Sequence, residues 1–156
     1  MQVRSHTSVL PTTRRQVLAG SGTVFLASIA GCSSFIDFTS ELALNEVNVF
    51  NMANRHINGS IKVDDPAGET TLQKTFDLEH EQDQNYSEVL GAAGKYTVSV
   101  ELTNTPVGGS SNADKIIFID DVDEERIGVV FNTNEEYDPI VIRVGTTPKD
   151  FLEVAN

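Results

Sequence analysis

The side chains that could do chemistry in this 156-residue chain are few and far apart. Cysteine occurs once, at Cys32, and histidine three times, at His6, His56 and His80. A single cysteine cannot form a disulfide within the chain or supply the thiolates of a structural zinc site. Isolated imidazoles without a thiolate do not make a zinc or blue-copper centre either. We therefore expect no cofactor.

Carboxylates are concentrated in one short segment, residues 120–125, which has five of them in six positions. Such a density of oxygen ligands could hold Ca²⁺, which takes about six to eight oxygens. The spacing of an EF-hand loop is absent, because no glycine stands at the sixth position and no glutamate at the twelfth. A solvated acidic turn is the default interpretation. Asp120, Asp121 and Asp123 are the candidates for a cation site.

The sequence lacks the patterns that are typical of enzymes. Gly108 to Ser111 is a flexible loop and not the G-x-S-x-G turn that presents a nucleophilic serine. No glycine-rich loop for phosphate binding follows an expected strand. A catalytic pair of carboxylates cannot be recognised among 23 acidic residues. We therefore expect a protein without catalytic activity.

The first 31 residues have the three parts of an export signal. Arg4, Arg14 and Arg15 come first, an uncharged stretch runs from Val17 to Ala30, and small residues stand at its end. The stretch is rich in glycine, serine, threonine and alanine, so it is only mildly hydrophobic. That composition suits an export signal better than a permanent membrane span.

Two motifs in this segment resemble those of exported lipoproteins. The adjacent Arg14 and Arg15, followed by an apolar pair, are similar to the twin-arginine motif, which a receptor reads. Ile29-Ala30-Gly31-Cys32 resembles a lipobox, the tetrapeptide at which lipoproteins are cleaved before their cysteine is lipid-modified. The resemblance implies cleavage after Gly31, a lipid on Cys32 and a location on the extracellular face of the cell membrane.

Two alternatives to a cleaved signal stay open. The segment could be retained as an anchor, because the 21 residues from Gln16 to Ile36, at about 1.5 Å each, could just cross a bilayer. The arginine pair could also be a chance match, with Cys32 as a small buried residue. With cleavage, the chain divides into a signal (1–31), a tether (32–40) and a domain (41–156).

The part that remains after cleavage is strongly acidic. The whole chain has 23 acidic and 11 basic side chains and a net charge of −12; three of the basic ones lie in the signal, which leaves 23 against 8, or −15. Nucleic acid is not an expected partner, because phosphate binding needs clustered lysine and arginine. The acidity resembles that of haloarchaeal proteins. An acidic protein from another organism, or one that binds multivalent cations, is the alternative.

From residue 41 onward, hydrophobic residues recur mostly at every second position, which is the period of a strand. The clearest case is Lys95 to Leu102. A phase shift near Asn45 predicts a bulge in the first strand. Residues 79–85 are expected to be a solvated loop and residues 86–90 a single helical turn, with no longer helix in the chain. The predicted strands are seven: 42–52, 57–63, 72–76, 95–102, 115–120, 127–131 and 139–144.

Seven short strands separated by turns favour an all-β, antiparallel sandwich. Leu90 to Tyr96 resembles the approach to a tyrosine corner, as in immunoglobulin-like and fibronectin-like domains. A transthyretin-like sandwich would show the same strand pattern. The resemblance therefore implies the fold class rather than one family.

Two Asn-x-Ser sequences begin at Asn58 and Asn85. In an exported chain they are acceptor sites for N-glycosylation, although this tripeptide also arises often by chance.

These features together predict a cell-surface lipoprotein, anchored through Cys32, whose β-sandwich is a non-catalytic binding or structural module. The alternative is an accessory subunit that presents a ligand or cation to a membrane transporter. The expected partners are membrane lipid, through Cys32, and a membrane or cell-envelope protein.

Overall fold

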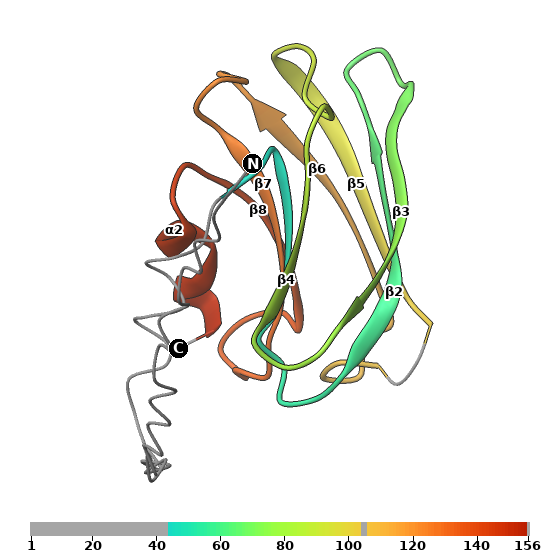
Figure 1. Ribbon diagram of the computed structural model, residues 1–156, viewed down its shortest axis with the longest axis vertical. Coiled ribbons are helices and arrows are strands. Elements are labelled where there is room, and N and C mark those ends of the chain that lie inside the picture. The colour runs from blue at the N-terminus through green and yellow to red at the C-terminus, as the bar shows by residue number, and fades with distance from the viewer. Residues whose placement is uncertain (1–43, 104–105, 156) are drawn as a thin grey trace, which may run out of the picture. The chain divides into compact units, whose positions relative to one another are not determined.

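The computed structural model describes residues 44–103 and 106–155. The predicted signal, lipobox and tether lie outside the described residues. The described part forms two four-stranded sheets with a short C-terminal helix (Figure 1), which confirms the all-β antiparallel sandwich. Its elements are β1 (Val47–Asn51), β2 (Ile57–Asp64), β3 (Thr70–Leu78), β4 (Gln82–Tyr86), β5 (Gly94–Leu102), β6 (Asn112–Ile119), β7 (Arg126–Phe131), β8 (Ile140–Gly145), α2 (Pro148–Leu152) and the 3₁₀ turn η1 (Glu153–Ala155).

The strand order is β4-β1-β7-β8 in the first sheet and β3-β2-β5-β6 in the second. Neighbouring strands are antiparallel, with the exception of β1 and β7, which pair in parallel. The consecutive strands β1 and β2 lie in opposite sheets. Immunoglobulin domains keep their first two strands in one sheet. The strand order of this sandwich is therefore different from theirs.

The inner face of the second sheet follows the period-two pattern of the sequence. In β2, every second residue from Ile57 to Val63 is buried, while the residues that alternate with them are half-buried. In β5 the alternation is the same, with Tyr96 and Val98 among the fully buried side chains. These residues pack against the first sheet in one hydrophobic core.

The first sheet is covered on both faces, because α2 and η1 pack on its outer side. All five residues of β1 are buried, and Phe50 and Val130 form a second cluster with Phe151 and Leu152 of α2. The rings of Phe50 and Phe151 stack with their centroids 5.8 Å apart. No helix in the described ranges is long and apolar enough to span a membrane.

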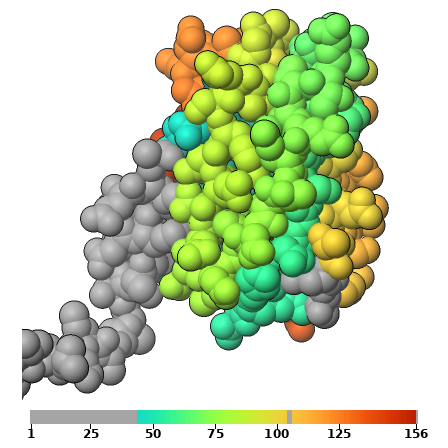
Figure 2. Space-filling model, turned by 45° about the vertical axis from the view of Figure 1, so that its right-hand side comes forward, coloured from blue at the N-terminus to red at the C-terminus, as the bar shows by residue number. Residues whose placement is uncertain are grey.

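Strand β4 corrects the prediction of a solvated loop at residues 79–85. Its sequence, QDQNY, has no apolar alternation. The strand forms because its backbone pairs along the full length of β1, from Val47 with Tyr86 to Asn51 with Gln82. As an edge strand it needs no second partner. β3 and β4 lie on the same side of the domain, which Figure 2 shows in green to yellow-green.

The predicted helical turn at residues 86–90 is wrong. Tyr86 ends β4, and the chain continues irregularly to β5. The Glu46 carboxylate accepts hydrogen bonds from the backbone N–H groups of Val89 (2.5 Å) and Leu90 (2.7 Å). These bonds satisfy the backbone N–H groups of the two buried residues without a helix.

The first strand is shorter than predicted, and the bulge near Asn45 is absent from it. Asn45 lies before β1, and its backbone is held by the buried Asn48 side chain, which accepts from the Asn45 N–H (2.9 Å) and donates to the Asn45 carbonyl (2.7 Å). Residue 42 lies outside the described part. The expectation of no helix beyond one turn is also wrong, since α2 and η1 together run from Pro148 to Ala155.

Candidate functional site

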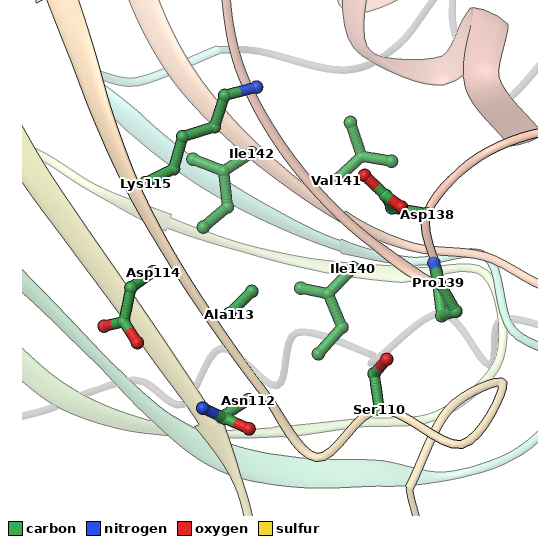
Figure 3. A pocket seen from close by; sticks show the side chains of 10 residues that line it. All are labelled: Ser110, Asn112, Ala113, Asp114, Lys115, Asp138, Pro139, Ile140, Val141 and Ile142. Carbon is green, nitrogen blue, oxygen red and sulfur yellow. The ribbon is translucent and has the colours of Figure 1, made fainter.

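The sandwich has an open side where β6 and β8, the last strands of the two sheets, lie next to each other. A cleft of about 270 Å³ separates them there. Figure 3 shows Ala113 of β6 facing Ile140 and Ile142 of β8, with Lys115 extended at one end and Ser110 at the other. The cleft has an aliphatic floor and a polar rim. Its volume is just below the roughly 300 to 1,000 Å³ of typical small-molecule sites.

The backbone of β6 presents unpaired groups on this side. The Leu102 N–H donates to the Ser111 carbonyl (2.7 Å), and the register between β5 and β6 continues without a break to the far end of β6. In an antiparallel ladder, hydrogen-bonded and non-bonded pairs alternate. Every second residue of β6 therefore points its N–H and C=O away from β5, toward the open edge. These residues are Asn112, Asp114, Ile116 and Phe118.

Two of these residues also expose large apolar side chains. Ile116 is 56% and Phe118 is 65% exposed, and both lie on the outer face of the sheet, opposite Thr97 and Lys95 of β5. A strand edge with exposed apolar side chains is a template for pairing with another chain. We call the outward-pointing groups of Asn112, Asp114, Ile116 and Phe118, with their side chains, the β6 edge.

Each of the two edge strands of the second sheet has a lysine on its inner face, which limits pairing with a further strand. Lys115 lies opposite the buried Val98, and Lys74 of the other edge strand, β3, lies opposite the buried Ile61. Both lysines are exposed although they stand on the inner face. An inward-pointing charge on an edge strand discourages indiscriminate strand association. Lys115 is therefore a protective charge beside the otherwise open β6 edge.

The acidic segment forms the loop between β6 and β7. The N–H groups of Asp120 and Asp121 donate to one Glu125 carboxylate oxygen (2.6 and 3.2 Å), and the Asp123 N–H donates to the Asp121 carboxylate (2.9 Å). The Arg126 guanidinium donates to the Asp123 carbonyl (2.7 Å). Across residues 44–103 and 106–155, no three His, Cys, Asp or Glu side chains gather as a metal site would require. A cation site in this loop stays a prediction.

The two glycosylation candidates both lie in strands. Asn58 is half-buried in β2, between β3 and β5. Asn85 is half-buried in β4, and its side-chain amide donates to the Asp83 carboxylate (2.8 Å). A transferase would have to reach these amides within paired strands. Glycosylation at either position stays a prediction.

Each of the two histidines in the domain has its own contact. His56 is exposed and paired with Asp77, and the hydrogen bond to this carboxylate raises the pKa of His56, with further electrostatic support from Asp77 and Glu79. His80 Nδ1 is in hydrogen-bond contact with the Ala53 carbonyl (2.9 Å).

The β6 edge was missed from the sequence, although one signal points to it. Residues 116–119 read IIFI, an uninterrupted apolar run inside a predicted strand. Such a run indicates that both faces of a strand are covered. Here the inner side chains Ile117 and Ile119 are buried while the outer pair is exposed. The outer face thus has the composition of a covered surface.

A scan against protein-family models found no match, and a search of curated proteins found none either.

Proposed function

We propose that the chain is a cell-surface lipoprotein whose β-sandwich is a non-catalytic binding or structural module anchored through Cys32. The observation that supports this proposal is the order of the segments along the chain. An arginine pair, an uncharged stretch and the only cysteine follow one another, and the folded domain begins with β1 at Val47, 15 residues after Cys32. The acidic excess without clustered basic residues argues against nucleic acid as a partner.

A short tether would keep the domain near the membrane. Between Cys32 and Leu44, where the described domain begins, lie residues 33–43, which reach about 40 Å at most when fully extended. The parallel pairing of β1 with β7 puts the start of β1 at the end of the sandwich where the acidic loop precedes β7. In this proposal the acidic loop is at the anchored end.

Of the two fold resemblances, we propose the transthyretin-like one. The first two strands lie in opposite sheets and β1 pairs with β7 in parallel. The immunoglobulin order instead keeps its first two strands in one sheet.

The accessory-subunit alternative finds less support in the geometry. A solute carrier needs a largely enclosed site, whereas the cleft beside β6 lies between two strand edges. Of the three candidate cation ligands, Asp120, Asp121 and Asp123, the carboxylate of Asp121 already accepts a hydrogen bond from the Asp123 N–H.

Phase partition with detergent tests the anchor. The intact protein should enter the detergent phase and Cys32→Ser the aqueous phase, because only a cysteine can form the thioether to the lipid. Arg14→Lys combined with Arg15→Lys should block export of a chain that keeps its cysteine, which separates transport from lipidation. Detergent partition of the Cys32→Ser protein equal to that of the original would contradict the lipid anchor.

A further inference from the structure

We propose that the β6 edge binds an extended segment of a partner protein as an additional strand, with basic residues at the two ends of that segment and apolar residues between them. The inference deepens the proposed binding role by naming its surface and the chemistry of its partner. It does not depend on lipidation at Cys32, so either proposal can fail without the other.

The outward-pointing backbone groups of the β6 edge require the bound segment to be extended. Asn112, Asp114, Ile116 and Phe118 point their N–H and C=O groups away from β5 at every second position, as derived above from the Leu102–Ser111 hydrogen bond and the register. A row of donors and acceptors at the spacing of a β-ladder matches the backbone of another extended chain. A globular ligand or a helix would leave most of these groups unpaired.

The side chains of the outer face decide the sequence of the occupant. Along the edge they read Asp114, Ile116, Phe118 and then Asp120, the first residue of the acidic loop. Neighbouring strands place their side chains next to each other on the same face. The complementary outer face therefore reads basic, apolar, apolar, basic. This pattern is the same in both directions, so it fits parallel and antiparallel addition.

The inner face adds a restriction. Lys115 stands between Asp114 and Ile116 but points to the inner side, beside Ile142 across the cleft (Figure 3). A lysine or a bulky apolar residue of the added strand at this level would meet the Lys115 ammonium group. A small polar residue such as threonine fits there. Apolar strands in general are thus disfavoured.

Charge favours a different protein over a second copy of this chain. The part after the lipobox has a net charge of −15, and pairing two β6 edges would bring Asp114 and the acidic loop of one copy toward those of the other. Like charges across a strand pair are destabilising, whereas opposite charges speed and direct association.

The test uses the full-length protein in detergent and the synthetic peptide Lys-Thr-Val-Thr-Val-Thr-Lys, which has the complementary outer face and threonine on the inner face. Hydrogen exchange of single amides is measured with millimolar peptide. The N–H groups of Asp114, Ile116 and Phe118 should become protected, while Lys115 and Ile117, already bonded to β5, should change little. The matched control peptide Glu-Thr-Val-Thr-Val-Thr-Glu should leave the edge unprotected.

Two variants separate the backbone contribution from the apolar one. Ile116→Pro removes an N–H that points away from β5, so the β5–β6 ladder is kept while strand addition is blocked, and peptide protection should be lost. Phe118→Thr keeps the backbone and removes only the exposed ring, so the affinity for the lysine peptide should fall about fivefold with an unchanged thermal midpoint.

Three results would overturn the proposal. The first is an unprotected β6 edge at millimolar lysine peptide in the original protein. The second is equal protection in the Ile116→Pro protein when its circular dichroism shows an intact fold. The third is protection of the edge without peptide that rises with protein concentration, which would identify a second copy as the occupant.

Discussion

Tyr96 shows how a buried hydroxyl can hold a turn together. Its side chain is fully buried, and its hydroxyl donates to the Ala92 carbonyl (2.7 Å) and accepts from the Ala92 N–H (3.3 Å). A tyrosine hydroxyl bonded to the backbone a few residues upstream, here four, is the contact of a tyrosine corner. The resemblance of Leu90 to Tyr96 predicted this local feature, although the strand order around it is not that of an immunoglobulin domain.

Tyr96 and Tyr86 should respond in opposite ways to loss of the hydroxyl. Tyr96→Phe should lower the free energy of unfolding by about 1 kcal/mol, because the two hydrogen bonds between the Tyr96 hydroxyl and the Ala92 backbone are lost. The buried Tyr86 hydroxyl has no hydrogen-bond partner in the described part of the chain, and burial raises its pKa. Tyr86→Phe should therefore be neutral or stabilising. Urea unfolding of both variants checks this; equal losses would contradict it.

His56 should make the stability depend on pH. Its pKa is raised by the hydrogen bond to Asp77 and by nearby carboxylates. A raised pKa means that the folded state binds the proton more tightly, so the stabilisation is present below about pH 6.5, the unfolded value, and is lost as the pH rises through the folded pKa. NMR titration should show a lower His56 pKa in Asp77→Asn. An unchanged His56 pKa in that variant would remove Asp77 as the cause.

At the scale of elements, local pattern predicted the strands of the second sheet well. A strand was predicted at residues 95–102, and β5 spans Gly94–Leu102. The prediction is close because successive side chains of β5 alternate between the buried inner face and the more open outer face of the sheet. β4 was missed because the partner that stabilises it, β1, lies more than thirty residues away in sequence. The full burial of β1 was missed because α2, at the other end of the chain, covers its outer face.

The packing of α2 on the first sheet needs a glycine at residue 128. A Cβ there would lie 2.1 Å from Cδ1 of Phe151, far inside van der Waals contact. Gly128→Ala should displace Phe151 and lower the free energy of unfolding by about 2–3 kcal/mol, since overpacked sites cannot relax fully.

Gly91→Ala is the matched control for this substitution. A Cβ at Gly91 has open space, so this variant should be neutral or slightly more stable in the same denaturant series. If Gly128→Ala were as stable as Gly91→Ala, α2 would not be tightly packed on β7.

At the scale of the whole molecule, the sequence predicts the net charge and the number of carboxylates, but not which carboxylates form hydrogen bonds in the fold. Five carboxylates in residues 120–125 were visible at once. Their division into carboxylates that hold the loop together, those of Glu125 and Asp121, and others that mainly add charge, such as that of the exposed Glu124, follows from hydrogen bonds and exposure. The β6 edge was out of reach for a similar reason, because the position of a strand in a sheet depends on all the strands together.

This division predicts two kinds of response to salt. The self-repulsion of a domain at −15 acts across a Debye length of about 10 Å at 0.1 M and about 3 Å at 1 M. The thermal midpoint of the original protein should therefore rise with KCl. Glu124→Ala, which removes a negative charge from an exposed position of the loop, should stabilise the protein by a few tenths of a kcal/mol at low salt and have little effect at 1 M.

Glu125→Ala removes the same charge and should behave differently. Its carboxylate accepts from the Asp120 and Asp121 N–H groups, and short hydrogen bonds are screened far less than distant charges. Its loss should cost about 1 kcal/mol at both salt concentrations, because two backbone donors then lose their acceptor. Thermal unfolding of both variants at low and high KCl compares the two effects. Identical salt dependence would mean that Glu125 acts in the loop only through its charge.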